Sequence, residues 1–479
     1  MLPKELQNTI DTLPAETQML FKAIVTYFEQ KLAEKDVRIK QLEDQISKNS
    51  SNSSKPPSTD EFKKKPKSLR KKSGLKPGGQ PKHEGSNLKM VDEPDKTILH
   101  PVNECTCCGK NLMHQLINKI ERRQVYDIPP IKIEVTEHQS EIKTCSCGHT
   151  NKAFPIGVNH YVQYGPNIKG TLVYLQDYQL LPYDRTKELV KDLFGHSIST
   201  GTLYNIGKYA YEKLEPFEEQ LKKLLTYCLV VGFDETGFRV MANRIWLHSY
   251  STAKHAYYQI HPRRGQVAMN AIGILPNFKG IAVHDFWKSY YTYQCDHALC
   301  NAHLLRDLIF IKERFEQDWA QDLIDLLLKM KTAKQKAIAQ GKSAFSLATI
   351  RKYKALYQAI LKKGFTLNPF KPPPVKKRGR PKKSAPRNLL ERLSNFADDI
   401  LRFFTNFSVP FDNNFSERDL RMMKVKQKIS GSFRSFTGAK YFARIRSYIM
   451  TARKQNVNAF DALANLFTDN TIANSLIRN

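Results

Sequence analysis

The first 48 residues carry apolar side chains at heptad spacing. Two rows recur every seven residues, offset by three places: Val25, Leu32, Ile39 and Ile46, and Phe21, Phe28, Lys35 and Leu42. These are the a and d positions of a coiled coil. One helix cannot bury such a stripe by itself, so we expect residues 1–48 to form a leucine-zipper helix that pairs two copies of the chain. Packing against the rest of the chain is the alternative, and Lys35 in the seam would make pairing weaker or more selective.

Helical periodicity returns over residues 160–222. Two predicted helices meet at a turn at Gly195–His196, and Ser199 or Thr200 suits the N-cap of the second helix. This order is typical of a helix-turn-helix, whose second helix would direct these side chains toward a DNA groove: Thr202, Tyr204, Asn205 and Lys208. A helical hairpin without DNA contact is the alternative.

From Cys228 the pattern changes to period two, which predicts strands. Three strands are expected in CLVVGFDETGFRV, RIWLHSYST and HAYYQIH, with a turn at Gly237. A helix in GQVAMNAIGIL and a short buried strand in GIAVHDFWKSY follow. Three antiparallel strands, a helix and a further strand are the opening order of a ribonuclease H-like domain, so we assign residues 223–299 to the first part of such a core.

Residues 300–403 then return to helical periodicity, in LLRDLIFIKERF, AQDLIDLLLKMKTAKQKAIAQ and ATIRKYKALYQAILKKG. We interpret them as an all-helical insertion that contains a basic linker at 369–388, and residues 404–479 as the second part of the core with C-terminal helices. The chain is therefore expected to be a multidomain α+β protein.

Charge narrows the class of partner. The 479 residues include 76 Lys and Arg against 46 Asp and Glu, a formal net charge of +30. Neutralising phosphates releases condensed counterions, so nucleic acid is the expected partner. The helix-turn-helix pattern, whose second helix would face a DNA groove, favours double-stranded DNA. No stretch approaches the ~20 apolar residues that span a bilayer, and the N-terminus lacks the pattern of a signal peptide. We expect a cytoplasmic, nucleoid-associated protein with no membrane partner.

Two segments concentrate the basic residues. Residues 49–99 are rich in Ser, Asn, Pro and Gly and predict a flexible basic linker that can follow a DNA backbone. Within the linker at 369–388, Arg378 and Arg380 stand in the core of an AT-hook motif, which inserts into a narrow minor groove. A plain basic linker is the alternative there.

Close cysteine pairs indicate a metal site. Cys105 and Cys108 form one pair, Cys145 and Cys147 form another, and a glycine follows each pair. Strand-like alternation at Ile131, Ile133 and Val135 between the pairs predicts two knuckles joined by a short hairpin that hold one Zn²⁺ in a module over residues 100–155. The second pair is one residue shorter than usual, so Cys107 or His149 could replace one ligand. Free thiols are the alternative, but they would leave a core-poor module without a staple.

Two aspartates follow the predicted apolar strands. Asp234 and Asp285 each stand where such a strand runs out, and pairing in the sheet centre would bring them together. Adjacent carboxylates repel, and a hard cation such as Mg²⁺ or Mn²⁺ resolves the repulsion. Two such ions can hold the attacking and leaving oxygens of a phosphoryl displacement. Either aspartate could instead be a cap or turn former.

A third carboxylate lies in the segment VPFDNNFSERDLRMMKVKQK. Asp412 or Asn413 is expected to cap a helix and Glu417 to project from its second turn, among cations that suit a phosphate backbone: Arg418, Arg421, Lys424, Lys426 and Lys428. Asp412 and Asp419 are rival ligands, and a Glu417–Arg421 pair is the structural alternative. In CNAHLLRDL, Cys300 and His303 have ligand-like spacing, but helix packing or DNA contact is favoured because no second pair is near.

Nearly the whole chain resembles the DDE transposases of bacterial insertion sequences, insertion-sequence-sixty-six type. The resemblance rests on the zipper, NSSNSSKPPS, KKSGLKPGGQP, the paired cysteines, LPYDRTKELVKDLFG, FDET, HDFWKSY, CNAHLLRDL and VPFDNNFSERDLRMMKVKQKISGSFRS. It implies that the DDE triad falls on Asp234, Asp285 and Glu417, the last within D-N-N-x-x-E-R. It also implies an all-helical insertion in the core and possible co-encoded accessory proteins.

The function expected from these observations is metal-dependent cleavage of element ends and joining of the freed 3′-hydroxyl to target DNA. A DNA-binding regulator, a nuclease that cuts without joining and a tyrosine or serine recombinase are the alternatives. The first explains the charge and the zinc module, but it does not require three carboxylates in these places.

Overall fold

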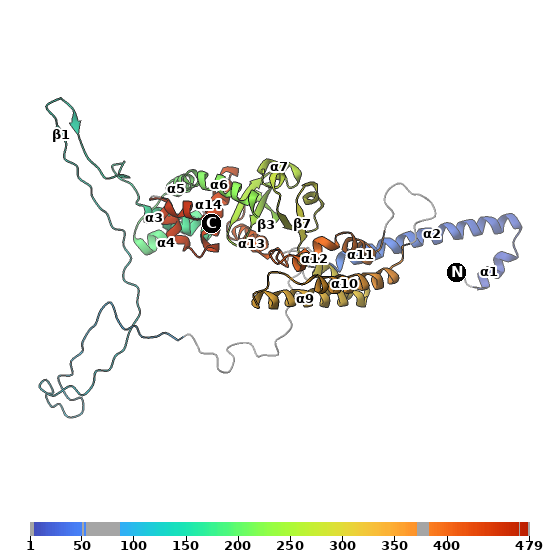
Figure 1. The fold of residues 1–479 in the computed structure, drawn as a ribbon, viewed down its shortest axis with the longest axis horizontal. Coiled ribbons are helices and arrows are strands. Elements are labelled where there is room, and N and C mark those ends of the chain that lie inside the picture. Colours follow the sequence, from blue (N-terminus) through green and yellow to red (C-terminus); the bar gives the residue numbers. More distant parts are fainter. Residues whose placement is uncertain (1–3, 50–51, 54–86, 371–382, 469, 478–479) are drawn as a thin grey trace. The chain divides into compact units, whose positions relative to one another are not determined.

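The computed structural model (Figure 1) describes these parts of the chain: 4–49, 52–53, 87–370, 383–468 and 470–477. The chain divides into two compact units, which we describe separately. One unit comprises Met1–Lys67, Pro155–Glu188 and Ile198–Asn479. The other comprises Ser68–Phe154 and Leu189–Ser197.

A five-stranded mixed sheet organises the first unit, in the order β5-β4-β3-β6-β7. Its strands are β3 (Val230–Val240), β4 (Asn243–Ser251), β5 (Ala256–His261), β6 (Ile281–His284) and β7 (Asp296–Leu299). The pairs β3–β4 and β4–β5 are antiparallel, whereas β6 runs parallel to both β3 and β7. The three antiparallel strands and the fourth strand predicted from the sequence are confirmed.

Two details of the sheet differ from the prediction. Gly237 does not form a turn, because it lies inside β3 opposite Trp246, and the chain turns instead at Met241, whose φ is 53°. A Cβ at Gly237 would stand 3.6 Å from the Trp246 ring, so the glycine leaves room for that ring. The short strand β7 was not predicted, because four residues carry too little periodicity.

Two C-terminal helices pack against the sheet, α13 (Asn414–Ser430) and α14 (Phe436–Lys454). Phe238 and Leu247 of the sheet share one apolar core with Leu420, Met423 and Phe442 of these helices. Burying such side chains stabilises the fold by about 1.5–3 kcal/mol each. This packing holds α13 beside β3.

The edge strand β5 is closed by hydroxyl side chains of α14. The backbone N–H of Ala256 donates to Thr451 Oγ1 at 3.1 Å, and that of Tyr258 donates to Ser447 Oγ at 2.9 Å. Thr451 Oγ1 donates back to the carbonyl oxygen of Ala256 at 3.2 Å. A strand edge that would otherwise present unpaired backbone groups is therefore covered by a helix.

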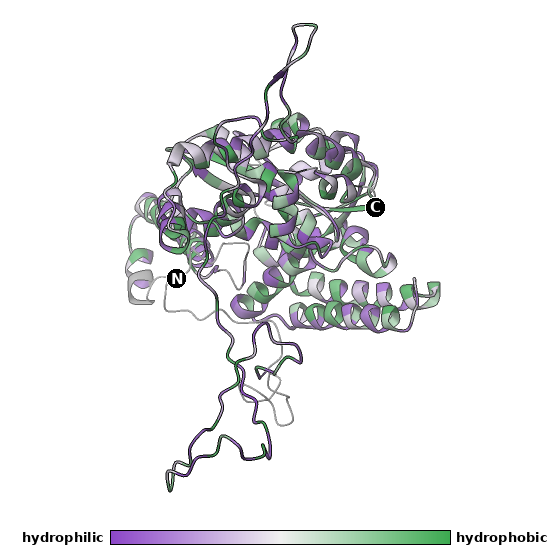
Figure 2. Ribbon diagram, turned by 90° about the vertical axis from the view of Figure 1, so that its left-hand side faces the viewer, coloured by the Kyte–Doolittle hydropathy of each residue, from purple (hydrophilic) through white to green (hydrophobic). Residues whose placement is uncertain are grey.

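The helices predicted within residues 300–403 are confirmed, and in the described part of this segment they form a bundle between β7 and α13. Its helices are α8 (Asn301–Phe315), α9 (Asp318–Ala339), α10 (Leu347–Leu367), α11 (Ala385–Asn395) and α12 (Ala397–Thr405). They contact one another and share a core around Trp319, Tyr357 and Phe403, to which β6 and β7 also contribute. Hydrophobic and hydrophilic residues interleave along the helices (Figure 2), as in amphipathic elements. The predicted linker at 369–388 ends sooner than expected, because α11 already begins at Ala385.

The N-terminal helix prediction is confirmed as two helices, α1 (Lys4–Asp11) and α2 (Ala15–Ile46). No residue of α2 is buried, and its heptad positions are exposed apart from the half-buried Val25. The helix ends beside α8, where Arg314 donates to Asp44 at 3.0 Å and to Glu43 at 2.8 Å. Pairing of two copies through α2 stays a prediction.

Helices also occupy residues 160–222 as predicted, and they are α3 (Pro166–Val173), the π-helical turn η2 (Tyr174–Tyr178), α4 (Tyr183–Phe194), α5 (Thr200–Lys213) and α6 (Glu215–Tyr227). Gly195 adopts a left-handed φ of 64° directly after α4. Ser199 caps α5, because its hydroxyl accepts from the Thr202 N–H at 3.0 Å.

The cysteine-bearing segment of the second unit has little regular structure. Its strands are β1 (Lys143–Thr144) and β2 (Thr150–Asn151). No side chain in residues 103–148 is buried. The prediction of a strand around Ile131 and Val135 is wrong, because this segment forms no strand and both side chains are exposed.

The remaining elements are α7 (Gln266–Ile272), η3 (Leu275–Asn277), η4 (Lys288–Thr292), α15 (Ala459–Leu466) and α16 (Thr471–Ser475). Within the described ranges, every helix is too short or too polar to cross a membrane.

Candidate active site

Asp234 lies in the middle of β3 rather than at its end, which corrects the sequence prediction. Pairing with β6 stops at Gly232, opposite Val283, so Asp234 lies two residues past the last parallel pair. One of its carboxylate oxygens, Oδ1, accepts from the Glu235 N–H at 2.8 Å. The backbone thereby fixes one oxygen and leaves the other free for a ligand.

Asp285 directly follows β6, as the sequence predicted. Its Oδ1 accepts from the Trp287 N–H at 2.9 Å. The preceding residue, His284, is fully buried and stacks on the Tyr290 ring at a centroid distance of 4.5 Å. Asp285 is therefore held by a local backbone bond on one side and by a packed aromatic pair on the other.

Glu417 reaches the sheet because α13 begins against Gly232. A Cβ at Gly232 would stand 2.3 Å from Asn413 Oδ1 and 2.7 Å from Ser416 Oγ, so only glycine permits this approach. The Asn413 amide donates to the Phe233 carbonyl at 2.8 Å and anchors the helix start. Glu417 lies in the first turn of α13, not the second as predicted.

The pKa of Asp234 responds to the other carboxylates of the site. Burial raises the pKa of Asp234 well above its usual range, and the negative charges of Glu235, Asp285 and Glu417 raise it further. Carboxylates beside a buried carboxylate offer the hard oxygen ligands that a divalent cation prefers. The donor chemistry of these residues therefore suits a hard divalent cation, although their ligand atoms are not gathered within 4.8 Å of one another among the described residues.

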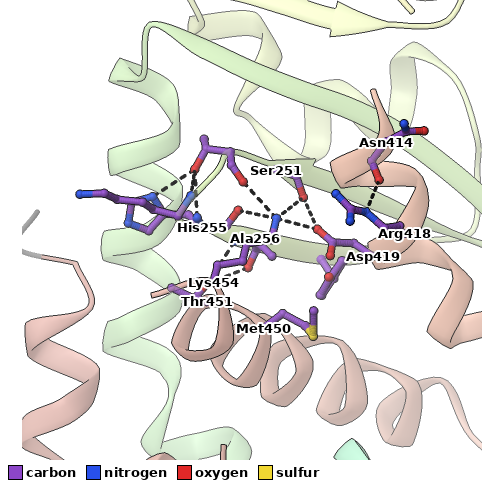
Figure 3. Close-up of polar contacts among 12 residues, drawn as sticks. Ser251, His255, Ala256, Asn414, Arg418, Asp419, Met450, Thr451 and Lys454 are labelled. Carbon is purple, nitrogen blue, oxygen red and sulfur yellow. Dashed lines mark hydrogen bonds and ion pairs between the residues drawn. The ribbon is translucent and has the colours of Figure 1, made fainter. Parts of the chain in front are cut away.

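The rival ligand Asp419 is used elsewhere (Figure 3). Its Oδ2 lies 2.9 Å from Lys454 Nζ and accepts from the Ser251 hydroxyl at 2.5 Å. Lys454 also donates to the carbonyls of Thr252 and His255. Asp419 is thus half of a buried, fully bonded ion pair, whereas Glu417, two residues earlier, is not.

The other rival, Asp412, pairs with Lys331 at 3.5 Å. Glu417 itself is directed toward Cys300 and His303 rather than into the pair with Arg421 that we considered. The arrangement of charges on α13 therefore singles out Glu417 as the carboxylate of this helix that accompanies Asp234 and Asp285.

Sequence reasoning missed Glu235 as a member of the site. Its carboxylate accepts from Arg264 Nε and Nη2 at 2.9 and 2.8 Å, and from the Tyr290 hydroxyl. Burial raises the pKa of Glu235, while the Tyr290 hydrogen bond lowers it. Period two places Glu235 on the opposite face of β3 from Asp234, so periodicity gave no signal that its carboxylate belongs to the site.

Arg264 extends from Glu235 into a row of aromatic side chains. Its guanidinium lies 4.2 Å from the Trp287 ring centroid and 5.0 Å from that of Trp246, and Arg244 lies 5.8 Å from Trp246. Arginine and tryptophan therefore alternate along a row that ends two residues from Asp285. No periodic signal in the sequence links these four positions.

Sequence reasoning also missed that Cys300 and His303 accompany Glu417. The Cys300 thiol donates toward Glu417 Oε1 at 3.7 Å, and His303 Nδ1 lies 3.5 Å from the same oxygen. Burial, and then the charge of Glu417, raises the pKa of the Cys300 thiol to about 12. Within the described residues, this trio is the one group of histidine, cysteine and carboxylate side chains close enough to share a metal ion.

The predicted DNA contacts fall on exposed positions where they are described. Arg418, Arg421 and Lys424 follow one another along the exposed side of α13, and Lys424 also donates to the carbonyl of Gly237. Lys208 is exposed on α5, 3.8 Å from Glu212. The AT-hook arginines, Arg378 and Arg380, lie outside the described residues.

The cysteine pairs form two similar turns. The Gly109 N–H donates to the Cys105 carbonyl and the Gly148 N–H to the Cys145 carbonyl, both at 2.9 Å. Both glycines have left-handed φ values, 71° and 84°, as the tight turns require. Hydrogen bonds from Cys108 and Cys107 lower the pKa of Cys105, and bonds from Cys147 and Ser146 lower that of Cys145. Each pair is formed locally, but the two pairs do not meet in one cluster among the described residues.

Comparison with known families gives three matches. A model described as the Transposase IS66 family matches residues 161–441, which include all three carboxylates. A model described as the zinc-finger binding domain of transposase IS66 matches residues 103–148. A family of unknown function matches residues 2–89. No curated protein matches the chain.

Proposed function

The chain belongs to the IS66 family of transposases, and from this premise we propose that it cuts the ends of its element and joins them to target DNA through Asp234, Asp285 and Glu417. The observation that carries the proposal is the placement of the acids: Asp234 lies two residues past the last β3–β6 pair, Asp285 directly follows β6, and the helix that carries Glu417 starts against Gly232. These acids come from β3, the end of β6 and the start of α13, and the charges of Asp285 and Glu417 both act on the buried Asp234.

The order β5-β4-β3-β6-β7, with three antiparallel and two parallel strands, supports a ribonuclease H-like core. In such a core the helical insertion and α13 would return the chain to the sheet. We assign the parts as in the sequence: zipper 1–48, linker 49–99, zinc module 100–155, helix-turn-helix-like segment 160–222, core 223–299 and 404–479, and insertion 300–403.

The residues that would hold the divalent cation are Asp234, Asp285 and Glu417. A bound Mg²⁺ or Mn²⁺ supplies charge neutralisation and Lewis acidity at the scissile phosphate. The chain's own contribution is positioning: backbone N–H groups fix one oxygen of each aspartate, and the contact at Gly232 fixes Glu417.

The reaction has two steps at one site. A water attacks the phosphodiester at the element's end, the P–O3′ bond breaks, and a 3′-hydroxyl is freed. That hydroxyl then attacks a target phosphodiester, forming a new P–O3′ bond and releasing a target 3′-hydroxyl. Neither step requires a covalent bond between protein and DNA, which separates the proposal from tyrosine and serine recombinases.

Arg418, Arg421 and Lys424 would bind the phosphate backbone beside the acids, because they line the exposed side of the helix that carries Glu417. Lys208 on α5 would contact the element's terminal repeat, and a dimer formed through α2 would bring two ends together. Arg378 and Arg380 would contact the minor groove. Accessory proteins encoded with the chain stay an expectation of the resemblance.

The match over residues 103–148 supports Zn²⁺ in the cysteine module. We propose Cys105, Cys108, Cys145 and Cys147 as the ligands, with Cys107 or His149 as replacements. The lowered pKa of Cys105 and Cys145 favours the thiolates that zinc requires. A module with no buried side chain needs a structural metal ion to hold one conformation.

The test is a joining assay with a pre-cut element end, a plasmid target and Mg²⁺. We expect joining by the wild type and a loss of at least about a hundredfold in Asp285→Asn, the scale on which one charge-stabilising group changes a rate. Asp412→Asn is the matched control, because its acid pairs with Lys331 and lies outside the triad. Equal joining by wild type and Asp285→Asn would contradict the proposal. DNA binding without cutting or joining would favour the regulator, and cutting without joining the nuclease.

A further inference from the structure

A second set of metal-ligand side chains lies against the triad. Cys300 Sγ, His303 Nδ1 and a Glu417 carboxylate oxygen all lie within 4.8 Å of one another. Glu417 Oε1 is 3.7 Å from the sulfur and 3.5 Å from the nitrogen. Ligands around a tetrahedral zinc are separated by about 3.3–3.5 Å, given Zn–N, Zn–O and Zn–S bonds of about 2.0–2.3 Å. The two separations from Glu417 Oε1 are therefore close to those that a tetrahedral ion would impose.

The fold fixes each of these donors independently. Cys300 follows β7 and is fully buried, and its sulfur accepts from the Asn413 N–H at 3.2 Å. His303 lies three residues later in the first turn of α8, so both side chains project from the same end of that helix. Glu417 arrives from α13, which Asn413 anchors to β3.

His303 Nδ1 lacks the partner that a buried nitrogen normally has. This atom is shielded from solvent and makes no hydrogen bond within the described residues. Buried polar atoms are almost always bonded, so an unpartnered one that faces a thiol and a carboxylate calls for an explanation. A metal ligand bond is one that uses all three groups.

We propose that Cys300, His303 and Glu417 bind a soft or borderline divalent cation, Zn²⁺ in the first place, at a site that shares Glu417 with the triad. Thiolate, imidazole and carboxylate form a typical zinc donor set, whereas Mg²⁺ demands oxygen ligands. Binding releases the Cys300 proton to solvent, since only the thiolate is a ligand. Three protein ligands leave one position for water or a phosphate oxygen.

The shared carboxylate makes the two cation classes compete. When Glu417 turns to zinc beside Cys300 and His303, it is withdrawn from Asp234 and Asp285, so zinc would inhibit the magnesium-dependent reaction. This consequence rests on the proposed function, whereas the binding site itself does not. The test therefore begins with binding and needs no DNA.

The probe is Co²⁺, added to the full chain after its cysteine module has been loaded with zinc. We expect a thiolate-to-cobalt charge-transfer band that disappears in Cys300→Ser. In His303→Gln we expect cobalt affinity to fall by at least about tenfold, the lower end of what even outer-shell changes cost a metal site. Cys228→Ser is the control, because this half-buried cysteine lies outside the group, and it should keep the band.

No band in the wild type, or an unchanged band in both Cys300→Ser and His303→Gln, would overturn the proposal. If Cys300→Ser fails to fold by circular dichroism, His303→Gln decides alone. The second readout is Zn²⁺ inhibition of joining at fixed Mg²⁺, where His303→Gln should need at least about tenfold more zinc for half-inhibition. Cobalt binding without any joining by the wild type would uphold the site and count against the proposed transposase chemistry.

Discussion

The carboxylate site and the cysteine module place ligands in opposite ways. Asp234, Asp285 and Glu417 come from distant parts of the sequence and are held by a packed sheet and helix. The cysteines of residues 103–148 are paired by local turns alone, in a segment with no buried side chain. Long-range packing positions the elements that carry the three acids, although it does not gather their ligand atoms into one cluster among the described residues. The cysteine pairs are formed by local turns and would need an ion to join them.

Removing zinc should separate the two regions most strongly. We expect a zinc-selective chelator to raise hydrogen exchange over residues 103–148 to that of an unfolded chain, because structural zinc contributes about 10–16 kcal/mol in small zinc modules. Exchange in β3 and β4 should not change. The measurement is exchange followed by mass spectrometry, with added Mg²⁺ as the control that should restore nothing. If residues 103–148 kept their protection from exchange after chelation, the cysteine module would not depend on zinc for its structure.

Lys454→Met tests how far packing, rather than an ion, holds the sheet region. The substitution leaves Asp419 buried without its cation, and breaking such a pair costs about 3–5 kcal/mol. Urea unfolding should show this loss, whereas Arg418→Met, an exposed change on the same helix as Asp419, should stay within about 0.5 kcal/mol. Equal effects of the two substitutions would mean that the buried pair has no special weight.

Gly232→Ala should damage the triad through geometry alone. The added Cβ would meet Asn413 and Ser416 at 2.3 and 2.7 Å, so α13 must shift. Overpacking of this kind lowers the free energy of unfolding by about 1–3 kcal/mol. The rate of joining should fall even at temperatures where the variant is fully folded, because Glu417 moves with the helix. Gly207→Ala on α5, where a Cβ meets nothing within 4 Å, is the control. An unchanged rate of joining in Gly232→Ala would mean that Glu417 does not take part in the reaction.

A smaller effect concerns acid. Burial lowers the pKa of His248 in β4 from 6.5 to about 4. Between these two pH values His248 is protonated in the unfolded chain and neutral in the folded chain. Stability from this group is complete above pH 6.5 and is lost as the pH falls toward 4, by about 2 kcal/mol at pH 5. Urea unfolding of wild type and His248→Gln between pH 7 and 5 should show a flatter profile in the variant. Parallel profiles would assign the acid sensitivity to other groups.

The sequence was informative where periodicity is long or residue chemistry is local. It predicted β3, β4, β5 and the helices of residues 300–403 because each spans several repeats of its pattern, and residue type narrowed the cap of α5 to Ser199 or Thr200, of which Ser199 is the cap. It could not show that Asp419 is neutralised by Lys454 or that Cys300 lies beside Glu417, because these contacts join residues 35 and 117 positions apart. Gly237 was misread as a turn because the ring of Trp246, which the glycine accommodates, comes from the neighbouring strand.

The hydrogen bonds from the backbone of β5 to Ser447 and Thr451 have a consequence when copies of the chain lie close together. The dimer that we propose on two DNA ends would hold two copies of this chain at a local concentration far above that in free solution. An open sheet edge under those conditions would invite strand-to-strand aggregation between neighbours. Because Ser447 and Thr451 already bond to the edge of β5, copies concentrated on DNA would be protected from pairing through that strand.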